Sequence, residues 1–240
     1  MRRTLTIARK EIRQSFVSPI AYAFLVVFVL FVTFMFFRVF FLVEQVSMSG
    51  FFGLFPIAFA IVIPGITMRS WAEEQKQGTL EFLLTAPVEP RHVVMGKFLA
   101  AMTLVVVCLL LTLLVPVTVS HFGDLDPGPV WGGYLGALFM AATCISIGMF
   151  FSSFTQNQIV AFLVSVSVLI GLVLVGDSYI QSEFGGGSFW GGLFRAVSPT
   201  PHFDSIGRGV IDLRDLFYFA GMSGLFLFLN VQAVHLKRWR

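Results

Sequence analysis

Charged residues are scarce in this sequence. Only 12% of its 240 residues are Asp, Glu, Lys or Arg, whereas 57% are hydrophobic. A soluble domain contains about 25% charged residues, because polar groups must cover the surface that faces water. The low charge therefore excludes a soluble enzyme, and the mean hydropathy of +0.87 indicates an integral membrane protein.

Cysteine and net charge are also low. Cys108 and Cys144 both lie in apolar runs, without a C-x-x-C motif or a nearby histidine, so neither a disulfide framework nor a zinc site is predicted. The formal charge of +3 comes from 16 Lys and Arg against 13 Asp and Glu. This excess is too small to predict a nucleic acid partner.

Motifs for catalysis are absent. The phosphate-binding pattern G-x-x-x-x-G-K-[ST] does not occur, because the run MGKF at 95–98 lacks both the upstream glycine and the following Ser or Thr. Neither H-E-x-x-H nor G-x-S-x-G occurs. We therefore predict a chain that is not an enzyme, that binds no cofactor of its own and that cannot hydrolyse ATP alone.

Two small groups contain metal-binding residue types: His202 with Asp204, and His121 with Asp124 and Asp126. Either group is able to bind an external cation. Acidic turns of this kind are commonplace on the outer surface of membrane proteins, so no metal site is predicted.

Long windows without charge are the main feature that is present. A helix needs about 20 apolar residues to cross the hydrocarbon core. Five windows without Asp, Glu, Lys or Arg reach this length, and the fourth is long enough for two crossings, with the polar run 152–158 as a turn between them. The sequence predicts an all-α integral membrane protein, one domain over 1–240, with spans at 19–37, 51–68, 98–119, 130–151, 159–176 and 216–234.

These predicted spans contain no Asp, Glu, Lys, Arg or His. Carriers driven by protons or sodium usually place ionisable groups near the membrane midplane, where the coupling ion needs a ligand. The pattern argues against self-powered transport. A passive channel, or a sodium site built from carbonyl groups, stays open.

Basic residues predict the orientation. With the N-terminus inside, twelve of the 16 Lys and Arg flank the inner side, and the four on the outer side are Arg38, Arg195, Arg208 and Arg214. By the positive-inside rule, both termini are cytoplasmic. We expect a multi-pass protein of the bacterial cytoplasmic (inner) membrane, with the lipid bilayer as its solvent.

The N-terminal segment 3–15 precedes the first span. Leu5, Ala8 and Ile12 recur at helical spacing among basic residues, which predicts a short amphipathic helix in the inner headgroup layer. The alternative is a positive flank that only orients the first span.

The segment 69–97 is the longest one on the inner side. Ser70 and Glu73 have the spacing of a capping box, which predicts a helix that continues or restarts just below the membrane. Gly78 predicts a break in the backbone, and Lys97 is expected to reach the interface with its ammonium group.

After this break, Thr79 can begin a second short helix, which the prolines at 87 and 90 end. Leu80, Leu83 and Leu84 would share one face of that helix. A leucine face beside carboxylates predicts a docking site for a partner protein. The alternative, that this face lies on the membrane or on neighbouring helices, stays open.

The run RSWAEEQKQGTLEFLLTAPV at 69–88, followed by Gly96-Lys97, resembles the coupling-helix signature of permease subunits in type-2 export ABC transporters. The resemblance implies six spans with an N-terminal interfacial helix, and docking on a separate cytosolic ATPase dimer that binds ATP and Mg. It also implies a second permease, either a copy or a paralogue. The docking residues that it implies are Glu73, Glu74, Gly78, Thr79, Leu80, Glu81, Leu83, Leu84 and Pro87.

The outer segment 177–215 contains the runs SPTPHF at 198–203 and RGVID at 208–212, which resemble the gliding-motility-associated branch of these permeases. The resemblance implies short helices that close the outer end of the pathway, and a periplasmic accessory protein. We expect packing against the spans or a second subunit, with a solvated loop as the alternative. The outer gate residues implied are Pro199, His202, Phe203, Arg208, Gly209 and Asp212.

Three functions remain in view. The first is the membrane subunit of an ATP-driven exporter, in which the coupling segment transmits the motion of the ATPase to a path between two permeases. The second is a self-standing channel or carrier. The third is the membrane anchor of a surface or gliding apparatus.

Overall fold

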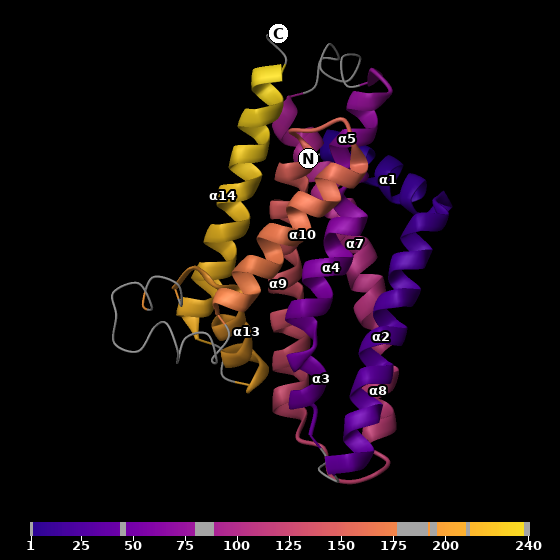
Figure 1. The fold of residues 1–240 in the computed structure, drawn as a ribbon, viewed down its shortest axis with the longest axis vertical. Coiled ribbons are helices and arrows are strands. Elements are labelled where there is room, and N and C mark those ends of the chain that lie inside the picture. Colours follow the sequence, from indigo (N-terminus) through magenta and orange to yellow (C-terminus); the bar gives the residue numbers. More distant parts are fainter. Residues whose placement is uncertain are drawn as a thin grey trace.

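A computed structural model describes residues 2–43, 47–79, 89–176, 192, 196–209 and 212–237 (Figure 1). These residues form helices and short connections, and no strand occurs among them. The helices are α1 (Arg2–Val17), α2 (Pro19–Val43), α3 (Ser49–Gly53), α4 (Phe55–Thr67), α5 (Arg69–Lys76), α7 (Pro90–Thr112), α8 (Leu114–Val119), α9 (Pro127–Ser152), α10 (Gln158–Val175), α13 (Pro199–Gly207) and α14 (Leu213–Lys237).

Within the described residues, six helical stretches are long and apolar enough to cross a membrane, which agrees with the predicted number of spans. They are Pro19–Leu42, Phe55–Lys76, Pro90–Val119, Pro127–Ser152, Gln158–Val175 and Leu213–Lys237. Several bounds differ from the prediction because a window without charge stops at the first charged residue, whereas the helix continues. The second stretch runs on past Arg69, and the third begins before Lys97.

The molecule has two distinct ends along its long axis. One end holds α1, α5 and the visible parts of both termini, and we call it the α5 end (Figure 1). The turn between α9 and α10 lies there too, because Ser152 is hydrogen-bonded to α5. The opposite end holds α3 and the connection after α8, and we call it the α3 end (Figure 1).

Helix α9 is the centre of the bundle. It packs against α4, α7, α10, α13 and α14. Small residues allow these close approaches: a Cβ at Gly133 would collide with the ring of Phe52, and a Cβ at Gly148 would collide with Thr67. Helices in lipid associate mainly through such packing, because lipid tails are as apolar as the side chains.

Helix α1 forms as predicted, but the face that it buries is not the expected face of Leu5, Ala8 and Ile12. Ala8 is buried, whereas Leu5 is exposed. The helix lies against α7, where a Cβ at Gly96 would come within 2.7 Å of Ile7, and Thr4 bonds to His92 at 3.0 Å. Helix α1 therefore packs on α7 through Ile7 and Ala8, whereas Arg9, Lys10 and Arg13 are exposed.

The glycine contact between α9 and α13 yields a stability prediction. A Cβ at Gly132 would overlap the backbone carbonyl of Ile206, which cannot rotate away. We expect Gly132→Ala to lower the free energy of unfolding by about 1–3 kcal/mol, seen as a lower Tm of the purified protein in detergent. Gly221→Ala is the control, because no atom lies within 4 Å of that added Cβ. Equal Tm values for the two variants would contradict this packing.

Candidate coupling site at the α5 end

Helix α4 continues into α5 through Met68, which has helical dihedral angles. The continuing helix was one of the two predicted outcomes, but the predicted capping box is wrong. No side chain caps α5 from its own N-terminal residues, and the Glu73 carboxylate binds Arg69 instead of the backbone. Ser70 lies within the helix and not at its N-terminus, so its side chain is not in the position of a cap.

The cap of α5 comes from another helix. Ser152, at the end of α9 and fully buried, accepts hydrogen bonds from the backbone N–H groups of Trp71 at 3.2 Å and Ala72 at 3.3 Å. Its hydroxyl donates to the carbonyl of Met68 at 2.9 Å. Ser152 therefore satisfies backbone groups at the junction between α4 and α5 and holds α9 there.

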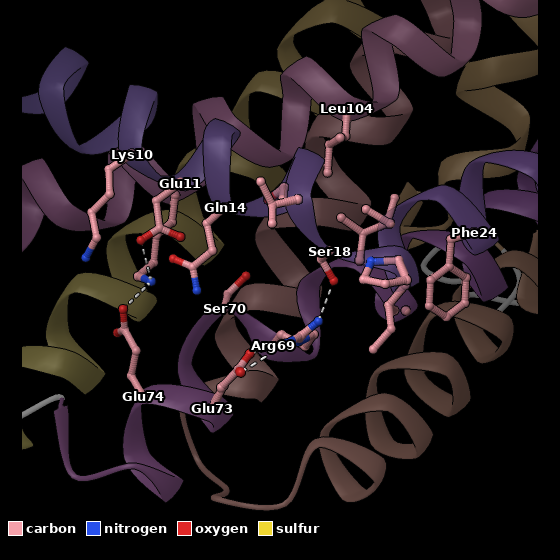
Figure 2. A pocket seen from close by; sticks show the side chains of 18 of the residues that line it. Lys10, Glu11, Gln14, Ser18, Phe24, Arg69, Ser70, Glu73, Glu74 and Leu104 are labelled. Carbon is pink, nitrogen blue, oxygen red and sulfur yellow. Dashed lines mark hydrogen bonds and ion pairs between the residues drawn. The ribbon is translucent and has the colours of Figure 1, made fainter.

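Arg69 joins α5 to the start of α2. Its guanidinium donates to both carboxylate oxygens of Glu73, at 2.7 and 2.9 Å, and a third N–H donates to the Ser18 hydroxyl at 2.7 Å. A two-pronged arginine–carboxylate pair fixes geometry better than a single contact does. The junction between α1 and α2 is thus held against the first turn of α5 (Figure 2).

Lys97 is buried, which makes the predicted extension to the interface wrong. Only 3% of its side chain is exposed, and its ammonium contacts Glu74 at 2.7 Å and Glu11 at 3.2 Å. It also lies 5.1 Å above the centre of the Trp71 ring. Because α1 packs over this part of α7, the ammonium is enclosed, and two carboxylates and an aromatic face stabilise its charge.

Helix α14 reaches the same site through its last residue. The Lys237 ammonium donates to the Gln75 side-chain oxygen at 2.6 Å and to the Ser153 carbonyl. The Gln75 amide donates to that same carbonyl at 3.0 Å. These hydrogen bonds therefore join α5 to the end of α14 and to the turn after α9.

The predicted docking residues are brought together only in part. Glu73 and Glu74 lie on α5, where each forms an ion pair. Helix α5 ends at Lys76. Gly78 has φ +68°, which is the predicted break, and the Thr79 hydroxyl donates to the carbonyl of Glu74 at 3.4 Å. The remaining predicted residues lie outside the described residues; they are Leu80, Glu81, Leu83, Leu84 and Pro87.

Sequence reasoning missed Glu11, Ser152 and Lys237 as parts of this site. One signal was available for Glu11, because it is the only acidic residue in an otherwise basic helix. Such a residue needs a cation if it is buried. No local pattern identifies Ser152 or Lys237, because their partners lie 80 and 162 residues away in the chain.

The outer segment contains a packed helix, so the solvated-loop alternative is wrong for 199–207. Helix α13 begins at Pro199, and the Ser198 hydroxyl caps its N-terminus. Phe203 and Ile206 are buried between α9 and neighbouring helices. Packing against the spans is thus confirmed for α13, whereas residues 177–191, 193–195 and 210–211 of the segment lie outside the described residues. A role in gating stays a prediction.

His202 contacts a residue that the sequence analysis did not group with it. Its Nδ1 lies 2.6 Å from a carboxylate oxygen of Asp215, not Asp204, and its ring stacks on Tyr218 with centres 4.1 Å apart. Arg208 ends α13, Gly209 has φ +83°, and Asp212 accepts a hydrogen bond from a backbone N–H at 2.9 Å. Across the described ranges, no group of three or more His, Cys, Asp and Glu residues is placed to hold a metal ion.

A comparison with protein families accords with this arrangement. A profile described as ABC-2 family transporter protein matches residues 5–230. The chain belongs to this family. ABC-2 membership makes it a multi-pass membrane protein of the permease type, the subunit of an ABC transporter that is generally not catalytic and that works with an ABC ATPase. No functionally curated protein matches the chain significantly.

The buried ammonium gives a prediction for this site. Lys97→Met leaves the Glu11 and Glu74 carboxylates facing each other without a cation, and we expect a loss of about 3 kcal/mol in the free energy of unfolding. Thermal unfolding in detergent measures the effect. Lys76→Met is the matched control, because Lys76 is exposed at the end of α5. An equal Tm for the two variants would show that the ion cluster contributes nothing.

Proposed function

We propose that this ABC-2 permease is the membrane subunit of an ATP-driven exporter, and that α5 with the segment after it docks on a separate cytosolic ATPase. The observation that carries the proposal is the set of contacts around α5. Side chains join this one short helix to α2 through Arg69, to α7 through Glu74, and to α9 and α14 through Gln75.

The contacts fall into two groups according to the helices that they reach. Arg69 and Glu74 act on α1, α2 and α7, whereas Trp71 and Gln75 act on α9 and α14. A displacement of α5 is thus passed to both sides of the bundle. Because the ion pairs are largely shielded from water, they resist separation better than surface pairs do.

Exposed residues at the tip of α5 are available to a partner. Lys76, Gln77 and Thr79 are exposed, and they continue directly into the segment with the predicted leucine face. In the proposed mechanism, ATP closes the ATPase dimer, α5 moves with it, and the spans tilt to open a path between two permeases. ATP and Mg are bound by the ATPase.

The proposed orientation places the α5 end in the cytoplasm of a bacterial cell, because the basic flanks gather there. The second permease is a copy of this chain or a paralogue. Large apolar faces of α2, α10 and α14 support such an assembly, because less than a quarter of each apolar stretch is buried within one chain. Lipid or a second permease must cover these faces.

Co-purification tests the docking. Tagged wild-type protein from its native membrane is expected to retain an ABC ATPase, identified by mass spectrometry. Gly78→Pro, and the double change Glu81→Lys with Leu84→Asp, are expected to reduce the retained ATPase at least about tenfold, with membrane insertion intact. Asp124→Lys at the α3 end is the control for a charge reversal. Undiminished ATPase on both docking variants would refute the assignment, as would solute transport by the purified chain in liposomes without ATPase.

Labelling tests the orientation. Cysteine is introduced at Gln77 in one variant and at Phe122 in another, both exposed and at opposite ends of the molecule. The native Cys108 and Cys144 are buried. A membrane-impermeant maleimide is expected to label Phe122→Cys in intact spheroplasts, and Gln77→Cys only after the membrane is opened. Labelling of Gln77→Cys in intact spheroplasts would place α5 outside and would exclude contact with a cytosolic ATPase.

A further inference from the structure

A cleft of about 670 Å³ lies at the α5 end, between α1, α2, α4, α5 and α7. Its two halves differ in chemistry. Charged and polar side chains from α1 and α5 line one half, including Lys10, Glu11 and Glu74. Apolar side chains from the membrane spans line the other half, namely Phe24, Ile66 and Leu104. Figure 2 shows Lys10, Glu11 and Glu74 together, with Phe24 at the opposite side.

The charges in the polar half do not cancel locally. Arg69 and Glu73 neutralise each other. Lys97 is a single cation between two carboxylates, those of Glu11 and Glu74, which leaves one net negative charge in that cluster. One oxygen of Glu74, Oε2, has no hydrogen-bond partner within the described ranges.

Lys10 supplies the opposite sign at the same end of the cleft. It is exposed and has no ion-pair partner among the residues that the structure describes. The hydroxyl and amide groups of Gln14, Ser15 and Ser70 also line this half. The polar half therefore presents a cation with neutral hydrogen-bond donors, beside a cluster with an excess of negative charge.

The apolar half is a continuation of this space along the membrane spans. Leu104 is buried in α7, and the ring of Phe24 packs directly against Gly65 of α4. The two halves fit a molecule that joins a charged headgroup to a hydrocarbon chain, with the headgroup in the polar half and the chain in the apolar half. A molecule with only one of these parts would leave the other half of the cleft unmatched.

We propose that this cleft binds a zwitterionic amphiphile whose headgroup carries a phosphate ester and a primary ammonium. The phosphate lies against Lys10 and the neighbouring donors, and the ammonium lies against Glu11 and Glu74. The hydrocarbon chain lies on Phe24, Ile66 and Leu104. The site shares Glu11 and Glu74 with the proposed coupling cluster, but binding of the amphiphile needs neither ATPase nor ATP, so it can be tested without the coupling.

Calorimetric titration of the purified chain in detergent, without ATPase or ATP, tests the proposal. The probe is short-chain phosphatidylethanolamine, which is expected to bind at a single site. Phosphatidylcholine of the same chain length lacks ammonium N–H donors, and phosphatidylglycerol lacks the amine. Each is expected to bind about tenfold more weakly, because a hydrogen bond to a charged group is lost. Equal binding of either lipid would overturn the proposal.

Free phosphoethanolamine separates the two sources of this headgroup chemistry. It is expected to bind at least about tenfold more weakly than the lipid, because it leaves the apolar half of the cleft empty. Binding as tight as that of the lipid would overturn the claim that the occupant is an amphiphile.

Variants locate the site. Lys10→Gln removes an exposed cation, and Glu74→Gln leaves Lys97 in a one-to-one pair with Glu11, so both are expected to fold and to weaken lipid binding about tenfold. Arg9→Gln is the matched control, because Arg9 is exposed on the same helix but does not line the cleft. Unchanged binding by both cleft variants would overturn the proposal, as would an equal loss in the Arg9 control.

Discussion

The burial of one ammonium group organises the α5 end. A lysine enclosed in protein must be paired, because removing its charge from water costs far more than packing its methylenes gains. Lys97 meets this requirement with carboxylates from two other helices and the face of Trp71. The cluster therefore exists only when α1, α5 and α7 are correctly placed, so it specifies their mutual positions.

A second group of contacts complements the cluster and joins α5 to α9 and α14. Ser152 accepts hydrogen bonds from two backbone N–H groups of α5, and the hydrogen bond from Lys237 to Gln75 connects α5 to α14. These bonds are neutral or close to water, so each contributes less than the buried cluster does. Together the two groups make α5 part of the bundle and not a loop attached to it. This property is what the transmission of force from a docked partner requires.

The sequence predicted the architecture well because lipid imposes a simple rule. Windows without charge had to be spans, and the polar run at 152–158 had to separate two of them. The wrong predictions for Lys97 and Ser70 both involve polar side chains near span ends. Lys97 was placed at the interface because its neighbours in sequence gave no sign that α1 would cover it. Ser70 was assigned as a cap, although the cap comes from Ser152, 82 positions later in the chain. Such contacts depend on tertiary packing, which no local pattern encodes.

The central claim is that the Lys97 cluster makes α5 and α1 move together. Spin labels on cysteines at Gln77 and Arg13, measured by pulsed electron resonance in the complex with its ATPase, test it most directly. The account predicts the same distance between the labels with and without ATP in the otherwise wild-type chain, and an ATP-dependent shift when Lys97→Met is added. A shift in the otherwise wild-type chain, or no difference between the two proteins, would contradict it.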